Sequence, residues 1–87
     1  MTYTTLKLCS GRAAYEAFPH PRRSIDLGKV RARIEREGIE VTDARVMLIA
    51  RHEPEVTIGR DGRLLVKTPD PVLAQRVFER FLRLVES

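Results

Sequence analysis

The chain has 87 residues, of which 43% are hydrophobic and 32% are charged, with a formal net charge of +4 and a pI near 9.8. A chain of this length forms one domain, residues 1–87, and buries about 60–65% of the surface that its unfolded state exposes. Such a domain has room for one small core. Its size therefore disfavours a deep catalytic cavity.

No apolar run approaches the roughly 20 residues that a membrane helix needs, and the N-terminus lacks the basic-then-apolar pattern of a secretory signal. We therefore expect a cytoplasmic protein that does not enter a membrane. The single cysteine, Cys9, excludes an internal disulfide and leaves no cysteine pair for zinc. We expect neither a metal nor a cofactor.

Sixteen basic residues stand against twelve acidic ones, so the surface is basic but mixed in sign. This balance is compatible with nucleic acid and equally with an acidic protein partner. Tryptophan is absent and aromatic residues make up only 6% of the chain, so few side chains are available to stack on nucleic-acid bases.

The first predicted strand covers Tyr3 to Cys9, where leucines alternate with polar residues. Gly11 ends it. Residues 10–24 contain glycine and two prolines and are predicted to form a loop, with a short extended piece from Ala13 to Phe18.

A helix is predicted to follow, capped by Asp26 and ended by Gly38. The Asp26 carboxylate can accept bonds from N–H groups of the first turn, and Gly38 can adopt the left-handed conformation after the last turn. Leu27, Val30 and Ile34 have the helical spacing of one buried stripe. The basic side chains predicted to point away from that stripe are Lys29, Arg31, Arg33 and Arg36.

The segment from Val46 to Ala50 is apolar on both faces, which favours a strand in the interior of the sheet that ends before Pro54. The segment from Glu55 to Thr68 is predicted to form a β-hairpin. A two-residue turn would place Val56 opposite Lys67 and so put a charge on the apolar face.

A loop of three residues, with Gly62 left-handed, instead pairs Ile58 with Leu64 and Val56 with Val66. We predict this second register because it alone keeps one face of the hairpin apolar.

The last helix is predicted to start at Pro71, with Asp70 as its cap. Its apolar stripe consists of Leu73, Val77, Phe78, Phe81, Leu82 and Val85. The order strand, helix, three strands, helix indicates an α+β domain, in which two helices cover one face of an antiparallel sheet of about four strands. The other face of the sheet should expose Met47, Ile49, Thr57, Leu65 and Lys67.

Cys9 precedes a glycine turn and lies three residues before Arg12, a cation that would make a thiol more nucleophilic. We favour instead a half-buried small hydrophobe, because no histidine is close in sequence and no second cysteine exists. His20 lies between prolines in an expected surface loop. One cysteine and two separated histidines match no known metal-ligand spacing.

Arg22, Arg23, Arg60 and Arg63 would form a cationic rim if their two loops meet, although charged hairpin tips are usually just solvated. The chain has no phosphate-binding glycine loop, no Ser-His-acid set and no paired carboxylates. We therefore expect no catalysis by this chain.

A family resemblance rests on several short runs: Leu8-Cys9-Ser10-Gly11-Arg12, Ile25-Asp26-Leu27, Glu55 to Ile58, and Asp61-Gly62-Arg63. Over about residues 6–85 the chain resembles the small C-terminal domain of ThiF/MoeB/HesA-type adenylyltransferases. These ubiquitin-activating-enzyme-like proteins adenylate the C-terminus of β-grasp sulfur carriers. The family pattern is Leu-Cys-Gly-Arg, whereas this chain has Ser10 inserted, and the glycine-rich nucleotide loop of the adenylation domain is absent from the sequence.

The resemblance implies a non-catalytic accessory module in a sulfur-carrier or ubiquitin-like activation system. Its partner would be an adenylyltransferase or a β-grasp carrier, and a homodimer through the free sheet face is also plausible. The candidate binding residues are Cys9, Arg12, Arg22, Arg23, Met47, Ile49, Arg60, Arg63, Leu65 and Lys67.

The chain also resembles one repeat of the TATA-binding protein, through Ile25-Asp26-Leu27 before a helix, His52-Glu53-Pro54 after a central strand, and a basic final helix. This likeness implies a similar fold and makes a small nucleic-acid-binding domain the alternative function. No phenylalanine is placed to wedge into DNA, because Phe78 and Phe81 belong to the buried stripe of the last helix.

Overall fold

The computed structural model describes residues 2–8, 13–21 and 24–86. Its main sheet is antiparallel and has six strands, in the order β2-β3-β8-β7-β6-β5. Their bounds are β2 Lys7–Leu8, β3 Tyr15–Ala17, β5 Glu40–Asp43, β6 Met47–Arg51, β7 Val56–Gly59 and β8 Leu64–Val66. The predicted α+β class is confirmed, but the sheet has six strands rather than about four.

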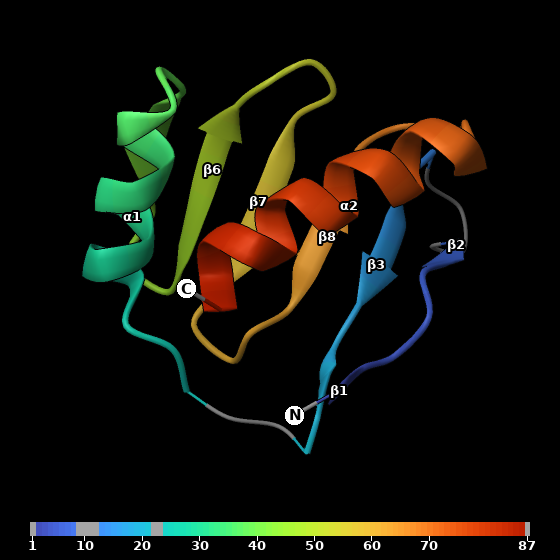
Figure 1. Ribbon diagram of the computed structural model, residues 1–87, viewed down its shortest axis with the longest axis horizontal. Coiled ribbons are helices and arrows are strands. Elements are labelled where there is room, and N and C mark those ends of the chain that lie inside the picture. Colours follow the sequence, from blue (N-terminus) through green and yellow to red (C-terminus); the bar gives the residue numbers. More distant parts are fainter. Residues whose placement is uncertain (1, 9–12, 22–23, 87) are drawn as a thin grey trace.

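The two helices, α1 (Leu27–Arg36) and α2 (Pro71–Glu86), cover the same face of this sheet (Figure 1). Helix α1 packs on β5 and β6, helix α2 packs on β8, and the helices contact each other. The core lies between these two layers. Its fully buried side chains include Val30, Ile34, Leu48, Val56, Ile58, Leu64, Val66 and Phe81. No helix of the described ranges has the length and apolar character needed to cross a membrane.

Two strands of the sheet were not among the four predicted ones. Strand β5 buries only Val41 of its four residues, so it has too few apolar positions for the alternation of a half-buried strand to stand out. Strand β3 falls within the predicted extended piece, and it joins the sheet by pairing with β8.

The prediction of one strand from Tyr3 to Cys9 is wrong. The N-terminal segment contains two short strands: β1 (Thr2–Tyr3) pairs with β4 (Pro19–His20), whereas β2 pairs with β3. Between them, the N–H of Thr4 donates to the Phe18 carbonyl at 2.8 Å, and the Phe18 N–H donates to the Thr4 hydroxyl at 3.0 Å. Side-chain bonding thus replaces the ladder here. Cys9 lies outside the described residues.

Helix α1 begins and ends as predicted. The Asp26 carboxylate accepts the N–H of Lys29 at 3.2 Å, and Gly38 has a φ of +80°. The N–H groups of Gly38 and Ile39 donate to the carbonyls of Glu35 and Ile34, which is the Schellman arrangement that closes a helix end.

One predicted surface residue of α1, Arg33, instead joins the two helices. Its guanidinium donates to the carbonyl of Leu84 at 3.1 Å, in the last turn of α2. This bond satisfies one of the carbonyl groups that a helix C-terminus leaves without an intrahelical partner.

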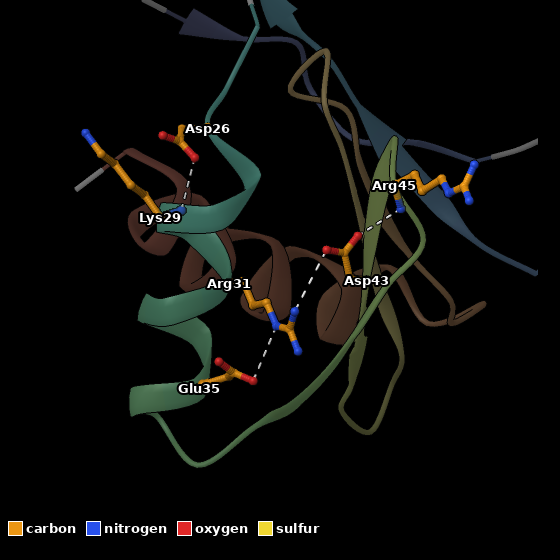
Figure 2. A network of polar contacts seen from close by, with 6 residues as sticks. All are labelled: Asp26, Lys29, Arg31, Glu35, Asp43 and Arg45. Carbon is orange, nitrogen blue, oxygen red and sulfur yellow. Dashed lines mark hydrogen bonds and ion pairs between the residues drawn. The ribbon is translucent and has the colours of Figure 1, made fainter.

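Arg31 links α1 to the edge strand β5. Figure 2 shows its guanidinium between Glu35, one turn further along α1, and Asp43 at the end of β5. The distances from Arg31 are 3.5 Å to Glu35 and 3.8 Å to Asp43. The ion pair with Arg31 explains why the charged side chain of Asp43 lies on the helix side of the sheet.

A tight turn joins β5 to β6. The Asp43 carboxylate accepts the Arg45 N–H at 2.8 Å, and Arg45 has a φ of +70° (Figure 2). Strand β6 consequently starts one residue later than predicted, at Met47, and leaves Val46 55% exposed. Its predicted interior position is confirmed, because β6 lies between β5 and β7.

The β7–β8 hairpin has the predicted register. Ile58 pairs with Leu64 and Val56 pairs with Val66, and Gly62 is left-handed with a φ of +89°. The N–H of Gly59 donates to the Arg63 carbonyl at 2.8 Å, which closes the three-residue loop between them.

Helix α2 also begins as predicted, since the Asp70 carboxylate accepts the N–H groups of Val72 and Leu73. The predicted stripe is correct except at its start. Leu73 is 38% exposed, and the fully buried residue of that turn is Ala74.

We predict that Gly62→Ala destabilises the fold more than Gly38→Ala does. Both glycines have positive φ, so both substitutions carry the backbone penalty of about 1–2 kcal/mol for a left-handed residue with a Cβ. A Cβ at Gly62 would in addition lie 2.6 Å from Pro19 Cγ, whereas a Cβ at Gly38 meets nothing within 4 Å. Urea denaturation should give a larger loss for Gly62→Ala, by at least about 1 kcal/mol. Equal losses would mean that β4 does not pack on this loop.

Candidate protein-binding surface

The sheet face opposite the helices, called the open face below, presents three rows of side chains that run across the strands. The first row is charged and consists of Glu40, Arg51, Glu55 and Lys67. The second row consists of Thr42, Ile49, Thr57, Leu65, Glu16 and Lys7. The third row contains Met47, Gly59 and Arg63. No helix of the described residues covers this face (Figure 1).

Residues of the second and third rows line a hollow of about 360 Å³ in the open face. Gly59 belongs to its lining, where the Asp61 carboxylate lies 2.7 Å from the position that a Cβ of Gly59 would take, and its borders come from the hairpin loop and the start of β6. The lining residues are Ser24, Val46, Met47, Thr57, Gly59, Arg60, Asp61, Arg63 and Leu65. The structure thus brings together Met47, Arg60, Arg63 and Leu65 of the predicted site.

Leu65 was predicted to be exposed, and that prediction is wrong. It lies on the open face, as predicted, but is only 7% exposed. Arg63 precedes it by two residues and so points to the same face, and its Nε donates to a Glu16 carboxylate oxygen at 2.8 Å. Because Glu16 lies opposite Leu65 in the register, this ion pair covers the leucine.

The guanidinium of Arg63 is therefore committed within the chain, where the sequence suggested a free cation. It also lies 5.8 Å from the ring centroid of Phe18. Arg60, by contrast, is exposed, and no ion pair to it is found among the described residues. Of the two hairpin arginines, only Arg60 has its charge uncompensated.

The two loops that carry the predicted cationic rim meet at the hollow. The N–H of Ile25 donates to the Arg60 carbonyl at 2.9 Å, and Ser24 lines the hollow. The segment that follows Arg23 is thus held against the hairpin. Arg22 and Arg23 themselves, like Cys9 and Arg12, lie outside the described residues.

The charged row alternates in sign across four strands. Glu40 lies opposite Arg51 in the β5–β6 pair. Glu55 precedes Val56, which pairs with Ala50, so it lies opposite Arg51 on the other side. Lys67 completes the row, with its Nζ 2.9 Å from a Glu55 carboxylate oxygen. The row carries no net charge, and it borders a second, polar hollow of about 490 Å³.

Both ring nitrogens of His52 have hydrogen-bond partners within the chain, so they are not free to act on a ligand at this surface. Arg80 Nη1 lies 3.2 Å from His52 Nε2, and because an arginine can only donate, Nε2 accepts. The other ring nitrogen, Nδ1, then donates to the Pro54 carbonyl at 3.1 Å. The ring also contacts Phe81 edge-on, with centroids 5.3 Å apart. His52 thus has a structural role between β6 and α2.

Metal binding has no support among the described ranges, where no group of three or more His, Cys, Asp and Glu side chains converges. His20 is an exposed residue of β4, paired with Thr2, on a different element from His52.

Comparison of the chain with protein-family models, with curated proteins and with solved structures finds no match. The resemblances to adenylyltransferase C-terminal domains and to the TATA-binding protein therefore stay predictions.

Three acidic members of the open face were missing from the predicted site, namely Glu16, Glu40 and Glu55. Glu55 could have been found from the hairpin register, since it alternates with Val56 and faces Lys67. Glu40 belongs to a strand that was not predicted, and Glu16 belongs to a predicted extended piece whose pairing with β8 was not predicted, so their place on this face had no local signal.

We predict that Glu16→Gln lowers the free energy of unfolding only slightly. The Glu16–Arg63 ion pair is partly exposed, with exposed side-chain fractions of 25% and 39%, and such pairs contribute about 0.2–1 kcal/mol. Urea denaturation of Glu16→Gln and of the exposed α2 control Glu79→Gln measures the difference. A loss above about 2 kcal/mol for Glu16→Gln would mean that this pair is a main determinant of stability.

Proposed function

We propose that this chain is a non-catalytic protein-interaction module whose docking surface is the open face. The partner class is the one that the family resemblance implies: an adenylyltransferase, or the β-grasp carrier on which it acts. In this proposal the chain supplies a shaped surface and no chemistry of its own.

The observation that carries the proposal is the hollow lined in part by Gly59. Val46, Met47 and Leu65 supply the apolar part of its lining, and Arg60, Asp61 and Arg63 supply charged groups beside them. Ile49 continues the apolar surface along β6. Exposed apolar surface bordered by polar residues is typical of protein interfaces, because water leaves it with a gain in free energy when a partner covers it. An interface of this kind needs apolar anchors at its centre and polar groups around them.

Charge supports a protein partner over a nucleic acid. Arg63 is paired with Glu16 and Lys67 is paired with Glu55, so two of the cations on the open face already have carboxylate partners. A phosphate backbone approaching this face would meet those carboxylates as well as the cations. A protein surface can instead match both signs.

The test is retention of a purified β-grasp carrier, and separately of an adenylyltransferase, on the immobilised chain. The wild-type chain should retain at least one of them. Met47→Glu should weaken the retained complex at least tenfold, because it places an unpaired charge at the apolar centre of the interface.

The matched control is Val72→Glu. Val72 is 65% exposed in the first turn of α2, which lies on the other side of the sheet, so the same chemical change there should leave retention unaltered. Thermal melting of both variants verifies that they are folded. Failure of the wild-type chain to retain either protein would contradict the proposed partner class.

A nucleic-acid-binding domain is the second candidate. Two exposed arginines, Arg45 and Arg60, have no ion pair among the described residues and lie at neighbouring turns, since the Arg60 N–H donates to the Val46 carbonyl at 2.9 Å. Together with the pI near 9.8, this gives one end of the sheet a local positive charge.

Titration with duplex and single-stranded oligonucleotides decides between the two candidates. Since the open face mixes both signs, we expect only non-specific binding, with a Kd no lower than about 10⁻⁶ M at physiological salt. A Kd below about 10⁻⁶ M that weakens steeply with salt, and that is lost in the double variant Arg45→Ala/Arg60→Ala, would favour the second candidate instead.

A further inference from the structure

We infer that the open face binds a second copy of this chain, in a symmetric dimer whose two-fold axis runs parallel to the strands, midway between β6 and β7. This inference rests on one part of the proposed function, namely that the open face is a protein interface, and it does not depend on the proposed partner class. It adds the identity of an occupant and the geometry of the contact.

The charged row carries the inference, because it is complementary to itself when reversed. Its order across the sheet is Glu40, Arg51, Glu55, Lys67, or minus, plus, minus, plus. A two-fold axis parallel to the strands exchanges β6 with β7 and β5 with β8, and so reverses this order in the second copy. Every charge in the row then meets its opposite.

The pairs that this symmetry generates are specific. Arg51 lies opposite Glu55 of the second copy, Glu40 lies opposite Lys67 of the second copy, and each pair occurs twice. Stacked sheets lie about 10 Å apart, so long side chains from the two faces meet halfway. Lys67 and Arg51 are exposed in the single chain, and the pair that Lys67 forms with Glu55 would become part of a charge network shared by the two copies.

The remaining rows fit the same symmetry. Met47 lies opposite Gly59 across β6 and β7, so the axis between them places Met47 over Gly59 of the second copy. Its side chain then enters the hollow of about 360 Å³. In the second row, Ile49 and Thr57 face each other in the same way. Met47 thus meets a hollow whose lining includes the Asp61 carboxylate, and Ile49 meets Thr57.

The other in-plane two-fold axis, perpendicular to the strands, does not give this match. It exchanges the two ends of every strand, and so lays the charged row of one copy on the row that contains Met47 and Gly59 of the other. Arg51 and Glu55 would then lose water without gaining a partner of opposite charge, which is costly. The sign pattern therefore selects one symmetry.

The experiment uses two single charge reversals, Arg51→Glu and Glu55→Arg. In the dimer of either variant alone, positions 51 and 55 of the two copies carry like charges, and this occurs twice per dimer. When the two variants are mixed, position 51 of each meets an opposite charge at position 55 of the other. The internal neighbours of each variant are the same alone and in the mixture, so only an intermolecular contact can be restored by mixing.

Sedimentation of the wild-type chain from about 1 μM to about 1 mM should reveal a monomer–dimer equilibrium. Each reversed variant should raise the dimer dissociation constant at least tenfold, and the equimolar mixture should return it to within a few-fold of the wild-type value. The controls Arg76→Glu and Glu79→Arg make the same charge changes on the exposed side of α2 and should leave dimerisation unaltered.

A wild-type chain that stays monomeric throughout this range would overturn the inference. So would a dimer that survives in both reversed variants, because it would use another surface such as the free edge of β5. The outcomes that contradict the proposed function differ from those that contradict this inference. A monomeric chain that retains a carrier through Met47 would leave the open face as an interface with a different occupant, whereas a dimer that retains neither protein would support the inference alone.

Discussion

The register of β7 against β8 decides which side chains this domain buries. Successive residues of a strand point to opposite faces, so a slip of one residue would turn the apolar residues of one strand, either Val56 and Ile58 or Leu64 and Val66, away from the helices. The left-handed Gly62 fixes the loop length, and so the register. The same glycine is a docking point, since the Tyr3 hydroxyl donates to its carbonyl at 2.7 Å. This one turn therefore determines which side chains of the hairpin face the helices and which lie on the open face.

Local chemistry made much of the fold predictable from the sequence. The hairpin register follows from a period of two and a turn of known type, and both helix starts follow from an aspartate whose carboxylate bonds the first turn. The break in the N-terminal strand had no such signal. It depends on contacts with residues far along the chain, such as the bond between Tyr3 and Gly62, 59 positions apart.

On the candidate surface too, features with a local sequence signal were predictable, and features that depend on residues far apart in the chain were not. Alternation along β6 placed Met47 and Ile49 on the open face correctly, because only the strand itself had to be known. The burial of Leu65 could not be predicted, because its cross-strand neighbour Glu16 pairs with Arg63, which is 47 positions away in the chain. That pair also changes the chemistry expected of the hairpin, since it leaves Arg60 as its free cation among the described residues.

The functional proposals depend on how charge and apolar area are arranged on the open face, more than on any single residue. The row of alternating charges has no net charge of its own, and the hollow lined in part by Gly59 gives the face its shape. Such a surface discriminates between partners by the order of its charges. The central claim is that one face of the sheet is covered and the other is open. Methyl NMR of the dilute chain with a soluble paramagnetic agent tests this claim most directly. We expect strong broadening for Met47 and Ile49. Little broadening is expected for Leu48, which alternates with them along β6, and for Ile58, which pairs with Leu48. Equal protection of all four methyl-bearing residues would contradict the account.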